Sequence, residues 1–261
     1  MKYGFIGCGN MGSSLARALA TVTKDIAITD RSGKAKALAE ELGITYTDSA
    51  TIASQCDRIF LGVKPQMMAE CLAPLQQILA VKKPLLITMA AGLKTEKISA
   101  MVGVKLPIIR IMPNTPTAVG KGMIPYCCNA LVEDAALADW LQDMIPCGRL
   151  DALQESQIDA ASALSGSGPA YFYLMAEALA DGAVSCGLPR EKALEYASLT
   201  MEGAARMLLE TGTPPGALRQ AVCSPGGSTL EGIRVLEERD FPSAVSDCVL
   251  AAYRRNLELG N

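Results

Sequence analysis

The sequence predicts an α/β fold in which a doubly wound sheet comes first and an all-α region follows. Short apolar runs alternate with helical stretches up to about residue 154. Beyond that point, β-branched alternation gives way to long segments rich in alanine and leucine. A glycine-rich turn directly after the first apolar run completes the pattern. We therefore expect two domains, at residues 1–154 and 155–261.

The first domain consists of apolar strands separated by helical stretches. We expect strands at 2–7, 25–30, 44–47, 56–63, 84–92, 106–113 and 122–128, with helices at 10–21, 32–43 and 67–79. Strands joined through helices pair in parallel by right-handed crossovers. The first domain is therefore predicted to be a Rossmann-like parallel sheet.

The second domain is predicted to be helical and to associate with a second copy of the chain. Pro189 suits the first position of a helix that ends before Gly212. The stretch 169–185 is apolar on nearly every face, and a small domain has little interior in which to bury it. A membrane span is disfavoured because Glu177 and Asp181 would lie in hydrocarbon. A partner subunit is the better explanation.

Composition excludes several classes of function. The chain has 261 residues, 50% of them hydrophobic, and a net charge of -3 without a long run of one sign. A surface for nucleic acid or for a membrane is not expected. Nine cysteines occur without a CxxC pair and without any histidine, so we expect no metal site and a reducing, cytoplasmic location.

The run from Gly7 to Gly12, GCGNMG, matches GxGxxG between a predicted strand and a predicted helix. In this context the glycines permit the turn, let the backbone approach a pyrophosphate, and allow close helix packing. A structural turn without a ligand is the alternative. We favour dinucleotide binding.

Residues after the second strand bear on the choice of coenzyme. Asp30 lies near the spacing at which a carboxylate accepts the ribose 2′-hydroxyl of NADH. Arg31 and Ser32 follow at once and would suit the 2′-phosphate of NADPH. We expect NADPH to be preferred and NADH to be accepted as well.

Near the end of the chain, SPGGST at 224–229 precedes an amphipathic helical run. Backbone N–H groups of a glycine turn that leads into a helix can bind an anion without a cationic side chain. In the alternative interpretation, Ser228 or Thr229 only caps the helix. Both roles can coexist.

Several motifs occur together in order: GCGNMG, VKPQ at 63–66, IMPNTPTAVGKG at 111–122, ALSGSGPAY at 163–171 and SPGGST. In this arrangement the chain closely resembles pyrroline-5-carboxylate reductases along nearly its whole length. The resemblance implies NAD(P)H-dependent reduction of the C=N bond of 1-pyrroline-5-carboxylate to L-proline. It also implies a homodimer that interlocks through the helical domain, with the active site where the nucleotide domain meets that dimer.

The resemblance also assigns roles to residues. It implies that Gly227, Ser228 and Thr229 bind the substrate, with the Thr229 hydroxyl as the catalytic group at the ring nitrogen. The residues implied to bind the coenzyme are Ile6, Gly7, Gly9, Asn10, Met11, Gly12, Val63, Lys64, Pro65, Met89, Ala90, Ala91 and Asn114. Arg31 and Ser32, inferred above from their position after the second strand, complete the predicted coenzyme site. Asp30 departs from the small polar residue common in the family.

The absence of histidine suits imine reduction. A carbonyl reductase needs a proton donor for the alkoxide, whereas an iminium already carries its proton. One alternative is another two-domain NAD(P)-dependent dehydrogenase or an imine reductase. A lysine-dependent hydroxyacid dehydrogenase is disfavoured, because the stretch 159–182 contains no lysine. A non-catalytic dinucleotide sensor is the other alternative, but it would have no need for an anion site at SPGGST.

Overall fold

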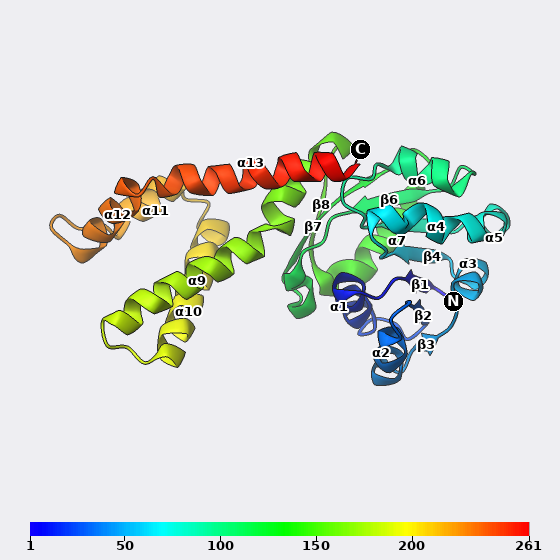
Figure 1. Cartoon of the computed structure of the whole chain (residues 1–261), viewed down its shortest axis with the longest axis horizontal. Helices are drawn as coiled ribbons and strands as arrows, with labels where there is room; N and C mark the ends of the chain where they lie inside the picture. The colour runs from blue at the N-terminus through cyan, green and yellow to red at the C-terminus, as the bar shows by residue number, and fades with distance from the viewer. Residues whose placement is uncertain (261) are drawn as a thin grey trace. The chain divides into compact units, whose positions relative to one another are not determined.

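A computed structural model describes residues 1–260, and its first part is built on one eight-stranded sheet. The strands are β1 (Tyr3–Ile6), β2 (Ile26–Thr29), β3 (Thr45–Tyr46), β4 (Arg58–Leu61), β5 (Leu85–Thr88), β6 (Ile108–Ile111), β7 (Gly122–Cys128) and β8 (Gly148–Ala152). Their spatial order is β3-β2-β1-β4-β5-β6-β7-β8 (Figure 1). The first six strands pair in parallel in the doubly wound order, which confirms the predicted fold class.

We expected every strand to pair in parallel, but β7 does not. β7 runs antiparallel to β6, with Ile109 opposite Cys128. Only a short 3-10 helix, η3 (Thr115–Val119), lies between these strands, whereas a parallel partner requires a longer crossover. α7 (Asp134–Met144) then provides such a crossover to β8, which pairs with β7 in parallel and was not expected from the sequence.

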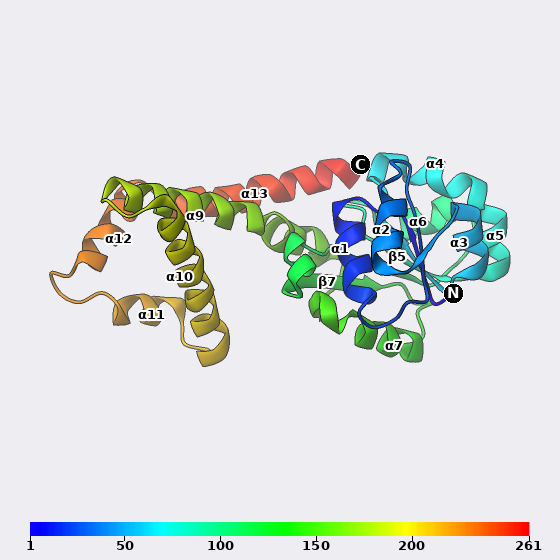
Figure 2. The same ribbon diagram turned by 90° about the horizontal axis from the view of Figure 1, so that it is seen from below.

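Helices cover both faces of the sheet (Figures 1 and 2). α1 (Asn10–Leu19), α2 (Lys34–Leu42) and α7 contribute to one buried cluster, and α3 (Ser49–Gln55), α4 (Met68–Leu72), α5 (Gln76–Lys82) and α6 (Thr95–Val102) contribute to the other. Successive strand residues serve opposite clusters, as Phe5 and Ile6 do. The helix expected at 67–79 is divided into α4, η2 (Ala73–Leu75) and α5, with Pro74 at the break.

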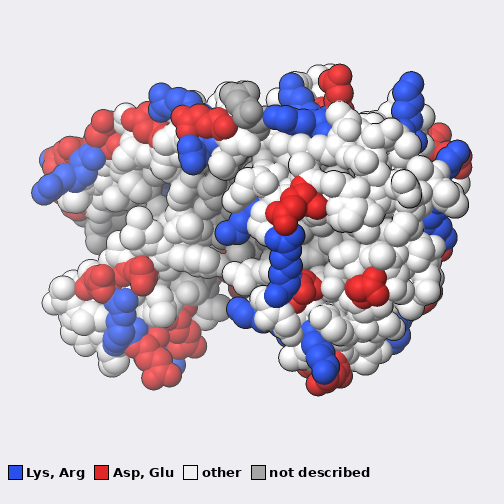
Figure 3. Space-filling view, turned by 45° about the vertical axis from the view of Figure 1, so that its right-hand side comes forward, with Lys and Arg blue, Asp and Glu red and all other residues white. Residues whose placement is uncertain are grey.

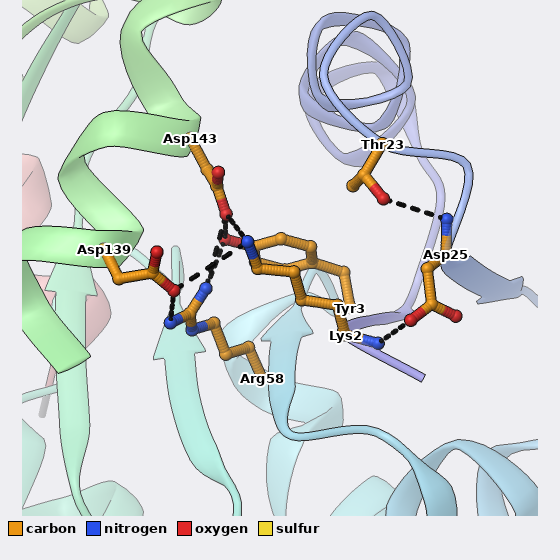
Figure 4. A network of polar contacts seen from close by, with 7 residues as sticks. All are labelled: Lys2, Tyr3, Thr23, Asp25, Arg58, Asp139 and Asp143. Atoms are coloured by element: carbon orange, nitrogen blue, oxygen red, sulfur yellow. Dashed lines mark hydrogen bonds and ion pairs between the residues drawn. The ribbon is translucent and has the colours of Figure 1, made fainter.

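The N-terminal edge of the sheet carries a network of polar contacts (Figure 4). The Tyr3 hydroxyl donates to Asp143 Oδ2 at 2.6 Å and accepts from Arg58 Nη1 at 2.9 Å. Lys2 Nζ lies 2.6 Å from the same Asp143 oxygen, and Arg58 also pairs with Asp139. Burial and the hydrogen bond to Asp143 raise the pKa of the Tyr3 hydroxyl. The network holds α7 against the first residues of β1 and β4.

The chain divides into two compact units, Met1–Ser167 with the residues from Ala251 onward, and Gly168–Leu250. Short elements at the end of the first segment are η4 (Ile145–Cys147), α8 (Glu155–Ala161) and a π-helical turn, η5 (Ser162–Gly166). The second unit contains α9 (Gly168–Ser185), α10 (Arg190–Thr211), α11 (Pro215–Ala221), α12 (Ser228–Glu238) and the first part of α13 (Phe241–Gly260). Pro189 caps α10, one position before the helix, instead of opening it, and Gly212 ends α10 with φ of 63°.

The second unit buries few of its apolar side chains. Its buried hydrophobic residues are all alanines: Ala176, Ala180, Ala193 and Ala197. Large exposed side chains include Phe172 at 59%, Leu174 at 68%, Leu199 at 58% and Leu209 at 77%.

In the described part of the chain, none of the helices combines the length and apolarity that a bilayer crossing requires. On the face shown in Figure 3, positive and negative side chains are interspersed.

Candidate functional site

The residues expected to bind a coenzyme gather at the C-terminal edge of the sheet. The strand order reverses between β1 and β4, and ligands of such sheets bind beyond the strand ends at this point. Gly7 follows β1, Asp30 follows β2, Val63 lies just beyond β4, and Met89 follows β5. Positions far apart in the sequence therefore share one edge.

The turn after β1 has the geometry that a bound pyrophosphate requires. Gly7 has φ of 99°, and its N–H donates to the Thr29 carbonyl at 2.9 Å. A Cβ on Gly12 would lie 2.4 Å from the Gly7 carbonyl oxygen, so only glycine lets α1 approach this closely. Around Gly9 no described atom lies within 4 Å of the place where a Cβ would stand. The first N–H groups of α1 thus begin at an open surface, which fits an anionic group.

Gly62, a residue that sequence reasoning missed, completes this turn. Its N–H donates to the Ile6 carbonyl at 2.8 Å, and a Cβ on it would lie 2.2 Å from the Gly7 oxygen. The loops after β1 and β4 are thereby in direct backbone contact. The available signal was a glycine between an apolar strand and the VKP motif.

The loop after β4 presents the other predicted coenzyme residues. Lys64 is extended, with φ of -63° and ψ of 148°, and it precedes η1 (Pro65–Met67). The N–H of Met67 donates to the Lys64 carbonyl at 2.9 Å, so the backbone of this loop is fixed while the Lys64 side chain is exposed. After β5, Ala90 is buried and Met89 and Ala91 are half-buried.

The side chains after β2 already contact one another. The Ser32 hydroxyl donates to Asp30 Oδ2 at 2.7 Å. Arg31 Nη2 donates to Glu70 Oε1 at 2.7 Å, although both side chains are largely exposed. Asp30 Oδ1 is buried and has no hydrogen-bond partner among the described residues.

The amide of Asn114 is engaged within the protein. Its Nδ2 donates to the Ser165 carbonyl at 2.9 Å, and its Oδ1 accepts from the Met123 N–H at 3.0 Å. Ser165 belongs to the π-helical turn η5, a feature common at functional sites. Asn114 therefore connects the loop after β6 to the start of β7 and to η5.

Cys8 is buried inside the glycine turn. Burial, with the nearby Asp30 charge as a second cause, raises the pKa of Cys8 to about 12. The thiol is therefore neutral near pH 7 and is a poor nucleophile.

Within residues 1–260, no three Cys, Asp or Glu side chains are grouped as a metal site.

SPGGST forms a turn directly before α12. Gly226 has φ of 69°, and the Gly227 N–H donates to the Ser224 carbonyl at 3.0 Å. Gly227 occupies the cap position and provides no side chain, so the cap that Ser228 or Thr229 was alternatively expected to form is not present. Both residues lie in the first helical turn and are exposed. The turn belongs to the second unit, whereas the predicted coenzyme residues belong to the first.

Comparison with known proteins supports the resemblance read from the motifs. A family model for pyrroline-5-carboxylate reductase dimerisation matches residues 155–259, and one for NADP oxidoreductase, coenzyme F420-dependent, matches 2–92. The pyrroline-5-carboxylate reductase of Escherichia coli K12 is 38% identical over 264 residues, covering 99% of this chain and 98% of the relative. That of Arabidopsis thaliana is 37% identical over 268 residues, covering 99% and 95%. The Plasmodium falciparum pyrroline carboxylate reductase, solved with NADP bound, has a TM-score of 0.90 at 32% identity, covering 100% and 98%.

Proposed function

This chain belongs to the pyrroline-5-carboxylate reductase family, and we propose that it reduces 1-pyrroline-5-carboxylate to L-proline with NADPH or NADH. The glycine-lined edge at the β1/β4 switch point carries this proposal. Its backbone groups are exposed at Gly9 and closely packed at Gly7, Gly12 and Gly62, as a dinucleotide pyrophosphate requires.

We assign coenzyme binding to residues 1–154 and both dimerisation and substrate binding to residues 155–261. The second assignment is supported by the apolar side chains that α9 and α10 leave exposed, because a second copy would cover them. All nine cysteines are free, which supports a reducing, cytoplasmic location.

The proposed coenzyme-binding residues form two groups along the C-terminal edge of the sheet. Ile6 to Gly12 hold the pyrophosphate through backbone N–H groups. Val63, Lys64 and Pro65, together with Met89, Ala90 and Ala91, line the ribose and nicotinamide side. The bound reduced nicotinamide supplies the hydride for the C=N carbon. The preference for NADPH, expected from Arg31 and Ser32, stays a prediction.

The substrate role of SPGGST follows from its backbone. Ser228 and Thr229 offer N–H groups at the N-terminus of α12, where a carboxylate is stabilised by the helix dipole. The Gly227 N–H donates to the Ser224 carbonyl, so we assign Gly227 to substrate binding through the shape of the turn. A Cβ on Gly227 would lie 2.4 Å from Ser224 Oγ and 3.1 Å from the Ser224 carbonyl oxygen, so a larger residue at this position would require Ser224 to move. The Thr229 hydroxyl is assigned to the ring nitrogen, where it stabilises the developing amine.

Absorbance of NADPH and NADH, followed with and without 1-pyrroline-5-carboxylate, tests the proposal. Thr229→Ala should lower turnover roughly 10- to 100-fold, since it removes the polar group at the reacting nitrogen, while coenzyme affinity stays nearly unchanged. Ser228→Ala is the matched control, because it removes a neighbouring exposed hydroxyl and keeps the backbone N–H groups. Equal turnover of wild type and Thr229→Ala would remove Thr229 from the mechanism. A folded protein that binds coenzyme without substrate-dependent oxidation would refute the enzyme assignment.

A further inference from the structure

The loop between β5 and α6 contains Met89, Ala90 and Ala91, which we assigned to the nicotinamide side of the coenzyme. Backbone contacts of this loop are long. The Leu93 nitrogen lies 3.4 Å from the Ala90 carbonyl oxygen, and the Met89 nitrogen lies 3.5 Å from the Leu61 carbonyl oxygen. Hydrogen bonds of this length are weak. The place of the loop therefore depends on what holds its far end, at the start of α6.

Glu155, the first residue of α8, holds the start of α6. Its Oε1 accepts the Thr95 N–H at 2.7 Å, and its Oε2 accepts the Thr95 hydroxyl at 3.1 Å. Thr95 is the first residue of α6 and is buried. Lys94 occupies the cap position, and its side chain has no oxygen to accept these groups. A carboxylate 60 residues away thus takes the place of the cap, where the helix dipole favours it.

The same helix contacts the loop a second time through Ile158. This side chain is fully buried and forms a small apolar cluster with Met112 and Cys127, against which Ala91 packs. α8 therefore meets the loop at two places, through the apolar cluster at Ala91 and through the carboxylate at Thr95. Two contacts from one helix fix both the position and the direction of the loop.

Buried charge fixes α8 to the sheet. Arg110 of β6 is fully buried, and its Nη2 donates to Asp159 of α8. Its Nη1 lies 3.9 Å from Glu155 Oε1. A buried cation is costly to leave unpaired, so the contact with Asp159 keeps α8 in place. The Glu155 carboxylate thereby connects β6 to the loop that follows the neighbouring strand, β5.

We propose that Glu155 is a positioning residue for hydride transfer, because it holds the loop 89–94 in the place that the nicotinamide ring requires. The rate of such a step depends steeply on placement, and a displacement of about 1 Å can cost about 100-fold. The inference rests on the proposed function. Glu155 acts through Thr95 and exchanges neither a proton nor an electron with the substrate.

Single-turnover measurement on the full chain tests the proposal: protein with bound NADPH is mixed with 1-pyrroline-5-carboxylate, and the loss of NADPH absorbance is followed. Glu155→Ala should slow this step roughly 10- to 100-fold. The Kd for NADPH should stay nearly unchanged, because the pyrophosphate is assigned to the turn after β1, and β4 lies between β1 and β5. Glu155→Gln should restore the wild-type rate, since an amide can accept the Thr95 N–H and donate to the Thr95 hydroxyl.

Asp48→Ala is the matched control. The Asp48 carboxylate caps α3 by accepting the Thr51 N–H at 2.9 Å and the Thr51 hydroxyl at 2.8 Å, the same pair of contacts that Glu155 makes with Thr95. β2, β1 and β4 lie between β5 and β3, the strand that precedes α3. The control should lose stability in urea, as Glu155→Ala does, but should transfer hydride at the wild-type rate.

Each result bears on a separate claim. A wild-type rate in Glu155→Ala, an equal loss of rate in Asp48→Ala, or a Glu155→Gln variant as slow as Glu155→Ala would overturn the positioning role and leave the reductase assignment intact. If Glu155→Ala does not fold, Ile158→Val decides, because it shortens the apolar contact and keeps the carboxylate. It should slow the same step about twofold or more, and an unchanged rate would overturn the proposal. Wild type that binds NADPH without oxidising it on addition of this substrate would overturn the proposed function together with this inference.

Discussion

The two edges of the sheet use polar chemistry in opposite ways. At the N-terminal edge, Lys2 and Arg58 meet Asp139 and Asp143 in a network of paired charges (Figure 4). At the C-terminal edge, glycines bring bare backbone to the surface, and the carboxylate of Asp30 keeps one oxygen unpaired. The same strands, β1 and β4, begin at the first of these edges and end at the second. We therefore expect the N-terminal edge to contribute mainly to stability and the C-terminal edge mainly to ligand binding.

The largest effect is expected from Asp143→Ala. The change leaves the partly buried Lys2 and Arg58 cations and the Tyr3 hydroxyl without their shared acceptor. Removing one partner of a buried pair costs about 3–5 kcal/mol of unfolding free energy. Because both cations keep Asp139 as a second partner, we expect the lower end of this range, about 3 kcal/mol. Chemical denaturation should show this loss, whereas the coenzyme affinity of the folded protein should not change. A loss of affinity without a loss of stability would contradict the separation of the two edges.

Two glycine variants, Gly62→Ala and Gly9→Ala, test the C-terminal edge of the sheet. Alanine at Gly62 would press on the Gly7 oxygen and separate the two loops, costing about 1–3 kcal/mol of stability and also weakening coenzyme binding. Alanine at Gly9 meets no described atom, so stability should stay near wild type while coenzyme binding weakens. Unfolding curves and calorimetry on both variants provide the test. Full coenzyme affinity in Gly9→Ala would show that the pyrophosphate lies elsewhere.

The smallest effect is expected from Asp139→Asn. A hydrogen bond from Arg58 holds the pKa of Asp139 below its ordinary value, so this carboxylate stabilises the fold above that value. The contribution is lost as the pH falls through the lowered pKa. Asp139 is half exposed, so the effect should stay below about 1 kcal/mol. Between pH 7 and pH 3, the urea concentration at the midpoint of unfolding should fall less steeply for Asp139→Asn than for wild type. Parallel curves for the two proteins would exclude a contribution of the Asp139 carboxylate to stability.

Local sequence signals were sufficient for the strands of the doubly wound sheet. β1 and β4 are short apolar runs directly followed by glycine, and β5 is an apolar run directly preceded by proline. Their burial on both faces leaves little ambiguity. The antiparallel direction of β7 was missed, because apolar content does not encode direction. The length of the link through η3 was the relevant signal.

The site was less predictable, since its contacts join distant positions. GCGNMG identified the turn at Gly7, but the need for glycine at position 62 arises only when β1 and β4 are adjacent. The contact of Arg31 with Glu70, which lies beyond the next two strands in the sequence, is likewise visible only in the folded chain. The sequence indicates which groups exist, and the fold determines which of them are already bound to one another.

The course of α13 has a consequence for the order of synthesis. The chain leaves the first unit after Ser167 and rejoins it at Ala251, where the Asn256 side chain donates to the Asp159 carbonyl at 3.1 Å. A chain emerging from the ribosome presents every strand of the sheet long before Asn256. The sheet can therefore assemble during translation, whereas its last attachment must wait until the helical unit has been made. α13 thus makes its contact with the first unit only after the intervening helices have been synthesised.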